Sequence, residues 1–287
     1  MRVLVTGADG FLGRYLVAGL SGHTLICASR RPMPGVDWRP LPDLGGNVDW
    51  APLLQGVDAV VHLANIAHQQ ASEDDFARVN QRATASLCAA AKGAGVRQLV
   101  YVSSIYAQVG HSSARVIRET DVPAPVNAYG RSKLATERAV AESGVPYTVL
   151  RPALVLGAGA KGNAGTLEKL ARLPLPLPLG SIDAKRSFLS AENFPSAVAT
   201  VLADARALGE TYIVADPEPR TVGEVVADMR IRLGRSPNLF PVPRGSLEFG
   251  VKALGGRGIW EKIGTPFIAS ADKLLALGWK PKRHPSA

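Results

Sequence analysis

A glycine-rich turn directly after the first apolar run restricts this chain more than any other feature of its sequence. Glycines at 7, 10 and 13 permit a tight turn, close approach of the backbone to a phosphate, and close packing of a helix on a strand. The helix that follows would offer unpaired N–H groups and a positive dipole end to a pyrophosphate. The turn therefore predicts a dinucleotide site that includes Gly7, Gly10, Phe11, Leu12 and Gly13.

Apolar strands alternate with helices through the first 150 residues. We expect strands at 3–5, 24–28, 38–41, 59–63, 99–102 and 147–150, and helices at 11–20, 76–94 and 128–142. Such strands, nearly continuous in apolar residues, imply a parallel sheet covered on both faces. The expected fold class is α/β, with a Rossmann-like doubly wound parallel sheet and a smaller C-terminal α/β substrate lobe.

The chain loses this regular pattern after Arg151. Residues 157–165 are rich in glycine, and residues 173–179 alternate leucine and proline, which excludes a helix or a central strand there. Helices are expected again at 191–205 and 222–233. We assign 1–155 to a NAD(P)-binding Rossmann domain and 156–287 to a substrate-binding lobe, with segments that return to the main sheet.

Composition excludes several classes of protein. The 287 residues contain no apolar run of membrane-spanning length and no recognisable signal peptide, and the only cysteines, Cys27 and Cys88, read as reduced thiols, so we expect a cytoplasmic protein without membrane association. The net charge of +9 is dispersed, so we expect no nucleic-acid partner; it indicates solubility or an anionic ligand. No metal site is predicted, and His62 is interpreted as a hydrogen-bonded core histidine.

Tyr129 and Lys133 form the second chemical motif. Four residues apart in a predicted helix, they share one face. A nearby ammonium favours the phenolate, so we expect Lys133 to lower the tyrosine pKa from its ordinary value of ~10. Ser104 ends another apolar run and could hydrogen-bond the reacting oxygen. Together with the glycine turn, these catalytic candidates predict hydride chemistry on a carbonyl or an alcohol.

The residues after the second strand bear on the choice of dinucleotide. NAD sites place Asp or Glu there for the ribose 2′-hydroxyl, whereas this chain has Ser29, Arg30 and Arg31. Guanidinium groups bind phosphate through charge-assisted hydrogen bonds. These three residues are therefore expected to bind NADP, with NAD as the alternative, unless the arginines are ordinary surface charges. Asp43 and Leu44 follow the third strand, where they either contact adenine or form an exposed turn.

These motifs resemble the extended short-chain dehydrogenase/reductases, in their sugar-nucleotide epimerase/dehydratase group, over nearly the full chain. Besides the glycine turn and the run 129–133, the resemblance includes segments 58–64, 101–104, 119–121, 151–152, 161–163, 186–188 and 277–281, and Asn80. The Leu-Pro-Leu-Gly stretch before Arg186 is similar to a bacterial subgroup that acts on UDP-hexoses. Departures at Val109-Gly110 and Asn65 leave the sugar unidentified.

The resemblance implies roles for individual residues. Tyr129 would be the acid/base, Lys133 would bind the nicotinamide ribose, and Ser104 would orient the sugar oxygen. Asn163 and Arg186 would contact the substrate diphosphate, although a surface ion pair is the alternative for Arg186. The cofactor site would also include Leu63, Ala64, Asn80, Tyr129 and Pro152. A homodimer through the helices 76–94 and 128–142 is implied as well.

Three functions follow as hypotheses. The first is reduction of a UDP-4-keto-hexose with NADPH, favoured because Arg30 and Arg31 suit a dissociable NADPH. The second is C4 epimerisation of a UDP-hexose with retained NAD. The third is an NADP-binding redox sensor without catalysis, which the presence of Tyr129, Lys133 and Ser104 disfavours.

Overall fold

A seven-stranded parallel sheet forms the centre of the computed structural model, which describes residues 1–66, 72–253 and 255–283. Its strand order is β10-β6-β5-β4-β1-β2-β3, and every neighbouring pair is parallel. The strands are β1 (Arg2–Thr6), β2 (Thr24–Ser29), β3 (Asp37–Pro40), β4 (Ala59–His62), β5 (Gln98–Val102), β6 (Tyr147–Pro152) and β10 (Glu210–Val214). This topology confirms the predicted Rossmann-like α/β fold class.

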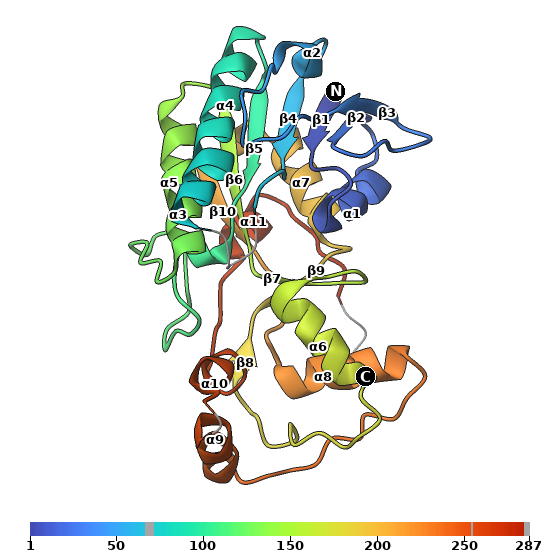
Figure 1. Cartoon of the computed structure of the whole chain (residues 1–287), viewed down its shortest axis with the longest axis vertical. Helices are drawn as coiled ribbons and strands as arrows, with labels where there is room; N and C mark the ends of the chain where they lie inside the picture. Colours follow the sequence, from blue (N-terminus) through green and yellow to red (C-terminus); the bar gives the residue numbers. More distant parts are fainter. Residues whose placement is uncertain (67–71, 254, 284–287) are drawn as a thin grey trace.

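Helices cover both faces of the sheet (Figure 1). Successive strand residues point to opposite sides, and the strands are apolar on both sides, so each face packs against helices. Val3 and Val5 belong to the apolar cluster shared with α1 (Phe11–Gly19), α7 (Phe194–Ala203) and α11 (Asp272–Ala276). Leu4 belongs to the opposite cluster, shared with α2 (Ala51–Leu54), α4 (Ala83–Gly93) and α5 (Ala128–Glu142). The strand order reverses between β1 and β4, where doubly wound sheets bind their ligands.

The helix expected at 76–94 begins earlier and is not uniform. Ser72 and Asp75 form a capping box, so α3 (Glu73–Asp75) starts the helix. A π-helical segment, η1 (Phe76–Arg82), then leads into α4. The π-helical segment contains Asn80, which is buried and hydrogen-bonded to the loop after β4. π-helical turns occur frequently at functional sites.

The C-terminal part both completes the main sheet and forms a smaller lobe. Strand β10 and helices α7 and α11 join the main sheet, whereas α6 (Gly162–Arg172) and α8 (Val222–Arg232) pack together in the lobe, at the lower end of Figure 1. The lobe also contains the pairs β7 (Leu154–Leu156) with β9 (Phe188–Ser190) and β8 (Lys185–Arg186) with β11 (Arg220–Thr221), and the helices α9 (Arg244–Ala253) and α10 (Arg257–Ile263). Short 3-10 turns are η2 (Ile105–Ala107) and η3 (Ala205–Ala207). The boundary at 155/156 stays a prediction.

No helix in the described ranges combines the length and the apolar composition that crossing a membrane requires.

Candidate active site

The turn between β1 and α1 has the geometry of a phosphate cradle. Gly7 adopts φ +71°, a left-handed conformation that glycine tolerates without strain. A Cβ at Gly13 would lie 2.2 Å from the carbonyl oxygen of Gly7, so only glycine lets α1 approach the turn this closely. No side chain caps the N-terminus of α1. Its first N–H groups are therefore available to an anionic ligand.

A pocket of ≈ 290 Å³ opens beside this turn, at the reversal of strand order. It is lined by Gly7, Asp9, Gly10, Ser29, Arg30, Leu41, Pro42, Asp43, Leu44, Leu63, Ala64, Asn65, Ile66 and Val79. Within the described residues, the buried Oδ1 of Asn65 has no hydrogen-bond partner. The glycine turn would fit the phosphates of a dinucleotide, and the apolar part of the pocket would fit its adenine. The unpaired Asn65 oxygen could accept a hydrogen bond from a ligand hydroxyl.

The three residues after β2 are placed differently from one another. The Ser29 hydroxyl is buried, donating to the Arg31 carbonyl (2.6 Å) and accepting from Trp38 Nε1 (3.0 Å). Arg31 is an exposed side chain whose Nε and Nη2 both lie 3.1 Å from Asp9 Oδ2. Arg30 is exposed and lines the pocket. Of the three side chains, Arg30 is therefore the one best placed for a ligand phosphate, and cofactor contact by all three stays a prediction.

Other predicted cofactor residues surround the same pocket or support it. Asn80 accepts a hydrogen bond from Ile66 N–H (2.8 Å) and donates to Ile66 O (3.1 Å), so its side chain holds the loop that contains Leu63 and Ala64. Asp43 Oδ1 accepts from Gly45 N–H (3.0 Å) in the turn after β3, while Leu44 is buried. Pro152 is buried at the end of β6.

Ser104, Tyr129 and Lys133 meet where β5 ends against the first turns of α5. Asn127 caps α5 by accepting from Gly130 N–H (2.7 Å), which fixes the helix start beside Tyr129. Ser104 begins η2, which packs against α5, and its hydroxyl lies close enough to Tyr129 to lower the tyrosine pKa. Lys133 is fully buried; its Nζ donates to Val102 O (2.9 Å) and lies 5.9 Å from the centroid of the Tyr129 ring.

The expected lowering of the Tyr129 pKa is corrected by the structure. Burial of the hydroxyl raises the pKa of Tyr129 to about 12, and the hydrogen bond with Ser104 only partly opposes this. Burial also lowers the pKa of Lys133 to about 7, so the ammonium is itself disfavoured. Desolvation of both groups outweighs their attraction, and Tyr129 therefore holds its proton at neutral pH.

His62 is the core histidine that the sequence indicates. Its Nδ1 lies 2.7 Å from Thr6 Oγ1 and its Nε2 lies 3.1 Å from Thr84 Oγ1. Thr84 donates its own proton to the Asn80 carbonyl (2.5 Å), so the imidazole must donate from Nε2. The ring therefore links β1, β4 and the helix under the cofactor pocket.

Acid should destabilise the protein through this histidine. Burial lowers the pKa of His62 to about 3. The unfolded chain takes up a proton near ~6.5 and the folded chain does not, so stability falls as pH drops from ~6.5 towards 3, at no more than ~1.4 kcal/mol per pH unit. Urea unfolding at several pH values measures how the free energy of unfolding depends on pH. Between pH ~6.5 and 3 this free energy should fall less steeply for His62→Gln than for the parent chain. Equal slopes would contradict a buried neutral His62.

Asn163 on α6 and Arg186 on β8 each contact helix α10, through Lys262 and Glu261 respectively. Arg186 is buried, and its guanidinium donates to three backbone carbonyls, those of His111 (2.8 Å), Glu261 (3.2 Å) and Thr265 (2.6 Å). It is therefore not the surface ion pair considered as an alternative, and its nitrogens are already engaged with protein. Contact of Asn163 and Arg186 with a diphosphate stays a prediction.

The structure adds three residues to this cluster that sequence reasoning missed. Lys262 Nζ lies 3.5 Å from Asn163 Oδ1, which places a cation where the predicted diphosphate would lie. Tyr106 lies near Asn163 and Arg186, which both oppose the rise of its pKa on burial, and its ring packs edge-on against His111 with centroids 5.2 Å apart. Lys262 lies 99 residues after Asn163, and no local motif marks it.

Comparisons of the chain with known proteins find a matching family and several similar proteins. A model of the NAD dependent epimerase/dehydratase family matches residues 3–215. UDP-glucose 4-epimerase of Vibrio cholerae is 28% identical over 298 residues, covering 97% of this chain and 90% of that protein. GDP-6-deoxy-D-mannose reductase of Pseudomonas aeruginosa is 32% identical over 78% of each chain. The solved structure of RMD from Pseudomonas aeruginosa complexed with NADPH has a TM-score of 0.71 at 26% identity, covering 99% of this chain and 94% of that one.

Proposed function

The chain belongs to the NAD dependent epimerase/dehydratase family, a family of enzymes that use NAD or NADP, and from that premise we propose that it is an NADPH-dependent reductase of a nucleotide-linked 4-keto sugar. The observation that carries the proposal is that Ser104, Tyr129 and the buried Lys133 lie together where the end of β5 meets the first turns of α5. The pocket beside the glycine turn would hold the dinucleotide. Arg30 in that pocket favours the 2′-phosphate of NADP over NAD.

The residues divide the work of carbonyl reduction. The dihydronicotinamide of bound NADPH supplies the hydride that reaches C4 of the sugar. Tyr129 donates its phenolic proton to the C4 oxygen, so that the ketone becomes a secondary alcohol. Ser104 hydrogen-bonds the same oxygen and holds it against the phenol. Lys133 then stabilises the phenolate until it regains a proton from solvent.

A UDP-sugar is the form of substrate that we propose. The small lobe places Asn163 and Lys262 together, and an amide beside an ammonium suits a diphosphate. Relatives of this chain include enzymes named for UDP-glucose and for a GDP-linked sugar, so the choice of base rests on the resemblance of the Leu-Pro-Leu-Gly segment. Parallel assays with UDP- and GDP-linked keto sugars would separate the two.

Net reduction is tested by stoichiometry. Purified protein is mixed with NADPH and a UDP-4-keto-hexose, and the loss of NADPH is compared with the alcohol formed. Equal molar amounts support the reductase. Formation of a C4 epimer without net change of cofactor would instead establish the epimerase. No turnover of any sugar nucleotide, together with discrimination between NADP+ and NADPH, would favour a sensor.

The epimerase is the second candidate, because the relative named for that activity covers 97% of this chain. An epimerase would retain its NAD. Denaturing the freshly purified protein and identifying the released nucleotide therefore distinguishes the two reactions. Bound NAD in near-stoichiometric amount supports the epimerase, and an empty or NADP-loaded protein supports the reductase.

The pH dependence of the reduction should reflect Lys133. Burial lowers the pKa of this lysine to about 7, so the ammonium is present below that pH and is lost above it. We expect kcat/KM to fall as pH rises through about 7, because kcat/KM reports ionisations of the free enzyme. A profile that stays flat to pH 9 would contradict this assignment, and Lys133→Met should have low activity without that descending limb.

We also propose a cytoplasmic location, and a homodimer through the helix at 76–94 (η1 and α4) and the helix at 128–142 (α5). The homodimer rests on the family resemblance alone, and light scattering of the purified chain tests it. A monomer at micromolar concentration would contradict the dimer.

A further inference from the structure

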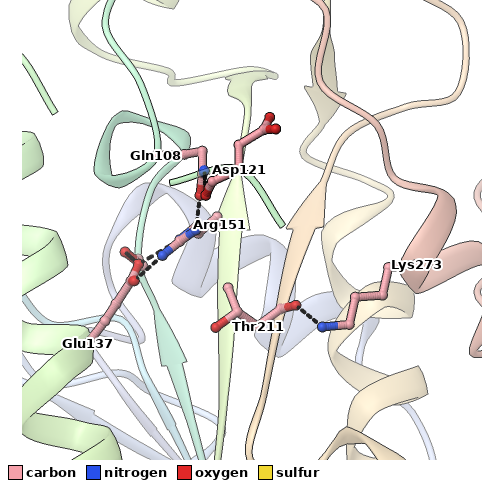
Figure 2. Close-up of polar contacts among 7 residues, drawn as sticks. Gln108, Asp121, Glu137, Arg151, Thr211 and Lys273 are labelled. Atoms are coloured by element: carbon pink, nitrogen blue, oxygen red, sulfur yellow. Dashed lines mark hydrogen bonds and ion pairs between the residues drawn. The ribbon is translucent and has the colours of Figure 1, made fainter. Parts of the chain in front are cut away.

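A buried ion pair joins the helix that carries Tyr129 and Lys133 to the neighbouring strand β6 (Figure 2). Glu137 is on α5 and Arg151 is on β6, and each side chain is only 6% exposed. Arg151 Nε donates to Glu137 Oε1 (3.0 Å), and Nη2 donates to Oε2 (2.5 Å). The guanidinium therefore binds the carboxylate through two parallel hydrogen bonds. These bonds fix the orientation of the guanidinium plane relative to the carboxylate plane.

Further hydrogen bonds connect this pair to two other segments. Ser103 Oγ donates to Glu137 Oε1, and Arg151 Nη1 donates to Gln108 Oε1. Gln108 Nε2 in turn donates to the carbonyl of Asp121 (2.6 Å), on the loop that leads to α5. The end of β5, the end of β6, helix α5 and the 108–121 loop therefore meet at one carboxylate and one guanidinium (Figure 2).

The catalytic residues are carried by the same segments. Ser103 immediately precedes Ser104, and Glu137 lies one turn after Lys133 and two turns after Tyr129 on the same face of α5. Helix α5 contacts the end of β5 through two successive turns, because Lys133 binds Val102 O and Glu137 binds the Ser103 hydroxyl. A helix held at two points cannot slide or rotate along the strand.

The stability of the fold alone does not explain two buried charges here. Desolvation of a buried pair often cancels its attraction, and apolar residues of similar volume frequently serve as well or better. Apolar residues, however, form no directional hydrogen bonds. They could not connect α5 to the end of β5, the end of β6 and the 108–121 loop in this way. The geometry of the network, rather than its net contribution to stability, is therefore the property that distinguishes it.

We propose that the Glu137–Arg151 ion pair positions the catalytic helix: it fixes α5 against the ends of β5 and β6, so that Tyr129 keeps its position relative to Ser104 and to the reacting oxygen. Neither residue touches the substrate, and both act through Ser103 and α5. The inference rests on the proposed function, since it assigns Glu137 and Arg151 as positioning residues for that reaction. The spacing from Tyr129 to Glu137 is regular, but sequence reasoning did not use it.

The test replaces both charges together, because a single substitution would leave an unpaired charge in the interior. In Glu137→Leu/Arg151→Met we expect kcat to fall at least ten-fold, since a misplacement of about 1 Å can cost on the order of 100-fold. NADPH affinity and the KM of the keto sugar should stay within about two-fold, because the ligands' own contacts remain. An unchanged kcat in this folded variant overturns the proposal.

Two further variants separate positioning from a general loss of an ion pair. Asp228→Leu/Arg220→Met removes the half-buried pair between α8 and β11 (side chains 16% and 22% exposed) and should leave kcat unchanged. Glu137→Gln/Arg151→Gln keeps polar links without charge and should recover part of the lost kcat. If Glu137→Leu/Arg151→Met does not fold, Ser103→Ala removes one link only and should lower kcat without lowering NADPH affinity; an unchanged kcat there counts against the proposal.

Hydrogen exchange gives a readout that does not depend on turnover. Backbone amides of residues 103–107 and 130–133 should exchange faster in Glu137→Leu/Arg151→Met than in the parent chain, whereas amides of α8 should not change. If the parent chain reduces no nucleotide sugar, the proposed function fails while this measurement still tests the positioning. Unchanged exchange at both segments overturns the positioning role.

Discussion

Tyr129→Phe should lower kcat for keto-sugar reduction about 10²–10⁴-fold, the usual range for the loss of a general acid. The phenol is the group that we propose as proton donor to the C4 oxygen, and Ser104 lies close to it at the end of β5. Phe preserves the ring, including its packing against Phe76 with centroids 6.1 Å apart, so the fold should persist. Steady-state kinetics with NADPH, together with a binding titration of NADPH, measure the two effects separately.

The binding titration is the internal control for this variant. NADPH affinity should change by less than about three-fold, because the glycine turn and Arg30 remain in place. Tyr147→Phe, at the opposite end of β6, is the matched substitution and should keep full activity. Retention of more than a tenth of kcat in Tyr129→Phe would show that another group delivers the proton, and the proposed roles of Ser104 and Lys133 would need to be reassigned.

Residues with local signals were predictable from the sequence. The glycine turn follows from spacing within a few residues, and the contact of Tyr129 with Lys133 on one helix face follows from the helical repeat. The doubly wound parallel sheet could be anticipated because apolar strands alternating with helices admit few topologies. His62 was predictable as well, since a histidine within an apolar strand must find hydrogen-bond partners when it is buried.

Properties that depend on burial or on distant contacts were not predictable. The direction of the Tyr129 pKa shift depends on how completely the hydroxyl is desolvated, and a four-residue spacing does not contain that information. The carbonyl partners of Arg186 come from three loops far along the chain. Lys262 is near Asn163 only because α10 packs beside α6 in the lobe. Predicting each of these features requires knowledge of the tertiary structure, which the spacing of residues along the sequence does not provide.

Arg30→Ala should weaken NADPH binding about ten-fold or more and leave NADH binding nearly unchanged. A charge-assisted hydrogen bond to the 2′-phosphate contributes about 1.5–3 kcal/mol at most, and ~1.4 kcal/mol corresponds to ten-fold in affinity. Arg30 lines the pocket, and the Ser29-Arg30-Arg31 segment has no carboxylate that would repel the phosphate. Fluorescence titrations of both nucleotides at low salt give the ratio directly, and the difference should shrink at high salt if the contact is exposed.

Arg31→Ala is the matched control, because it removes the same charge from the adjacent position. Arg31 is already paired with Asp9, whose side chain lines the pocket beside the glycine turn. Its loss should weaken NADPH and NADH to a similar, small extent, since an unpaired Asp9 repels the pyrophosphate that both share. Arg31→Ala that selectively weakens NADPH would transfer the 2′-phosphate role from Arg30 to Arg31. If Arg30→Ala lowers the affinity for both nucleotides equally, or for neither, these arginines are ordinary surface charges. That result would remove the main support for NADPH over NAD, and with it the preference for reduction over epimerisation.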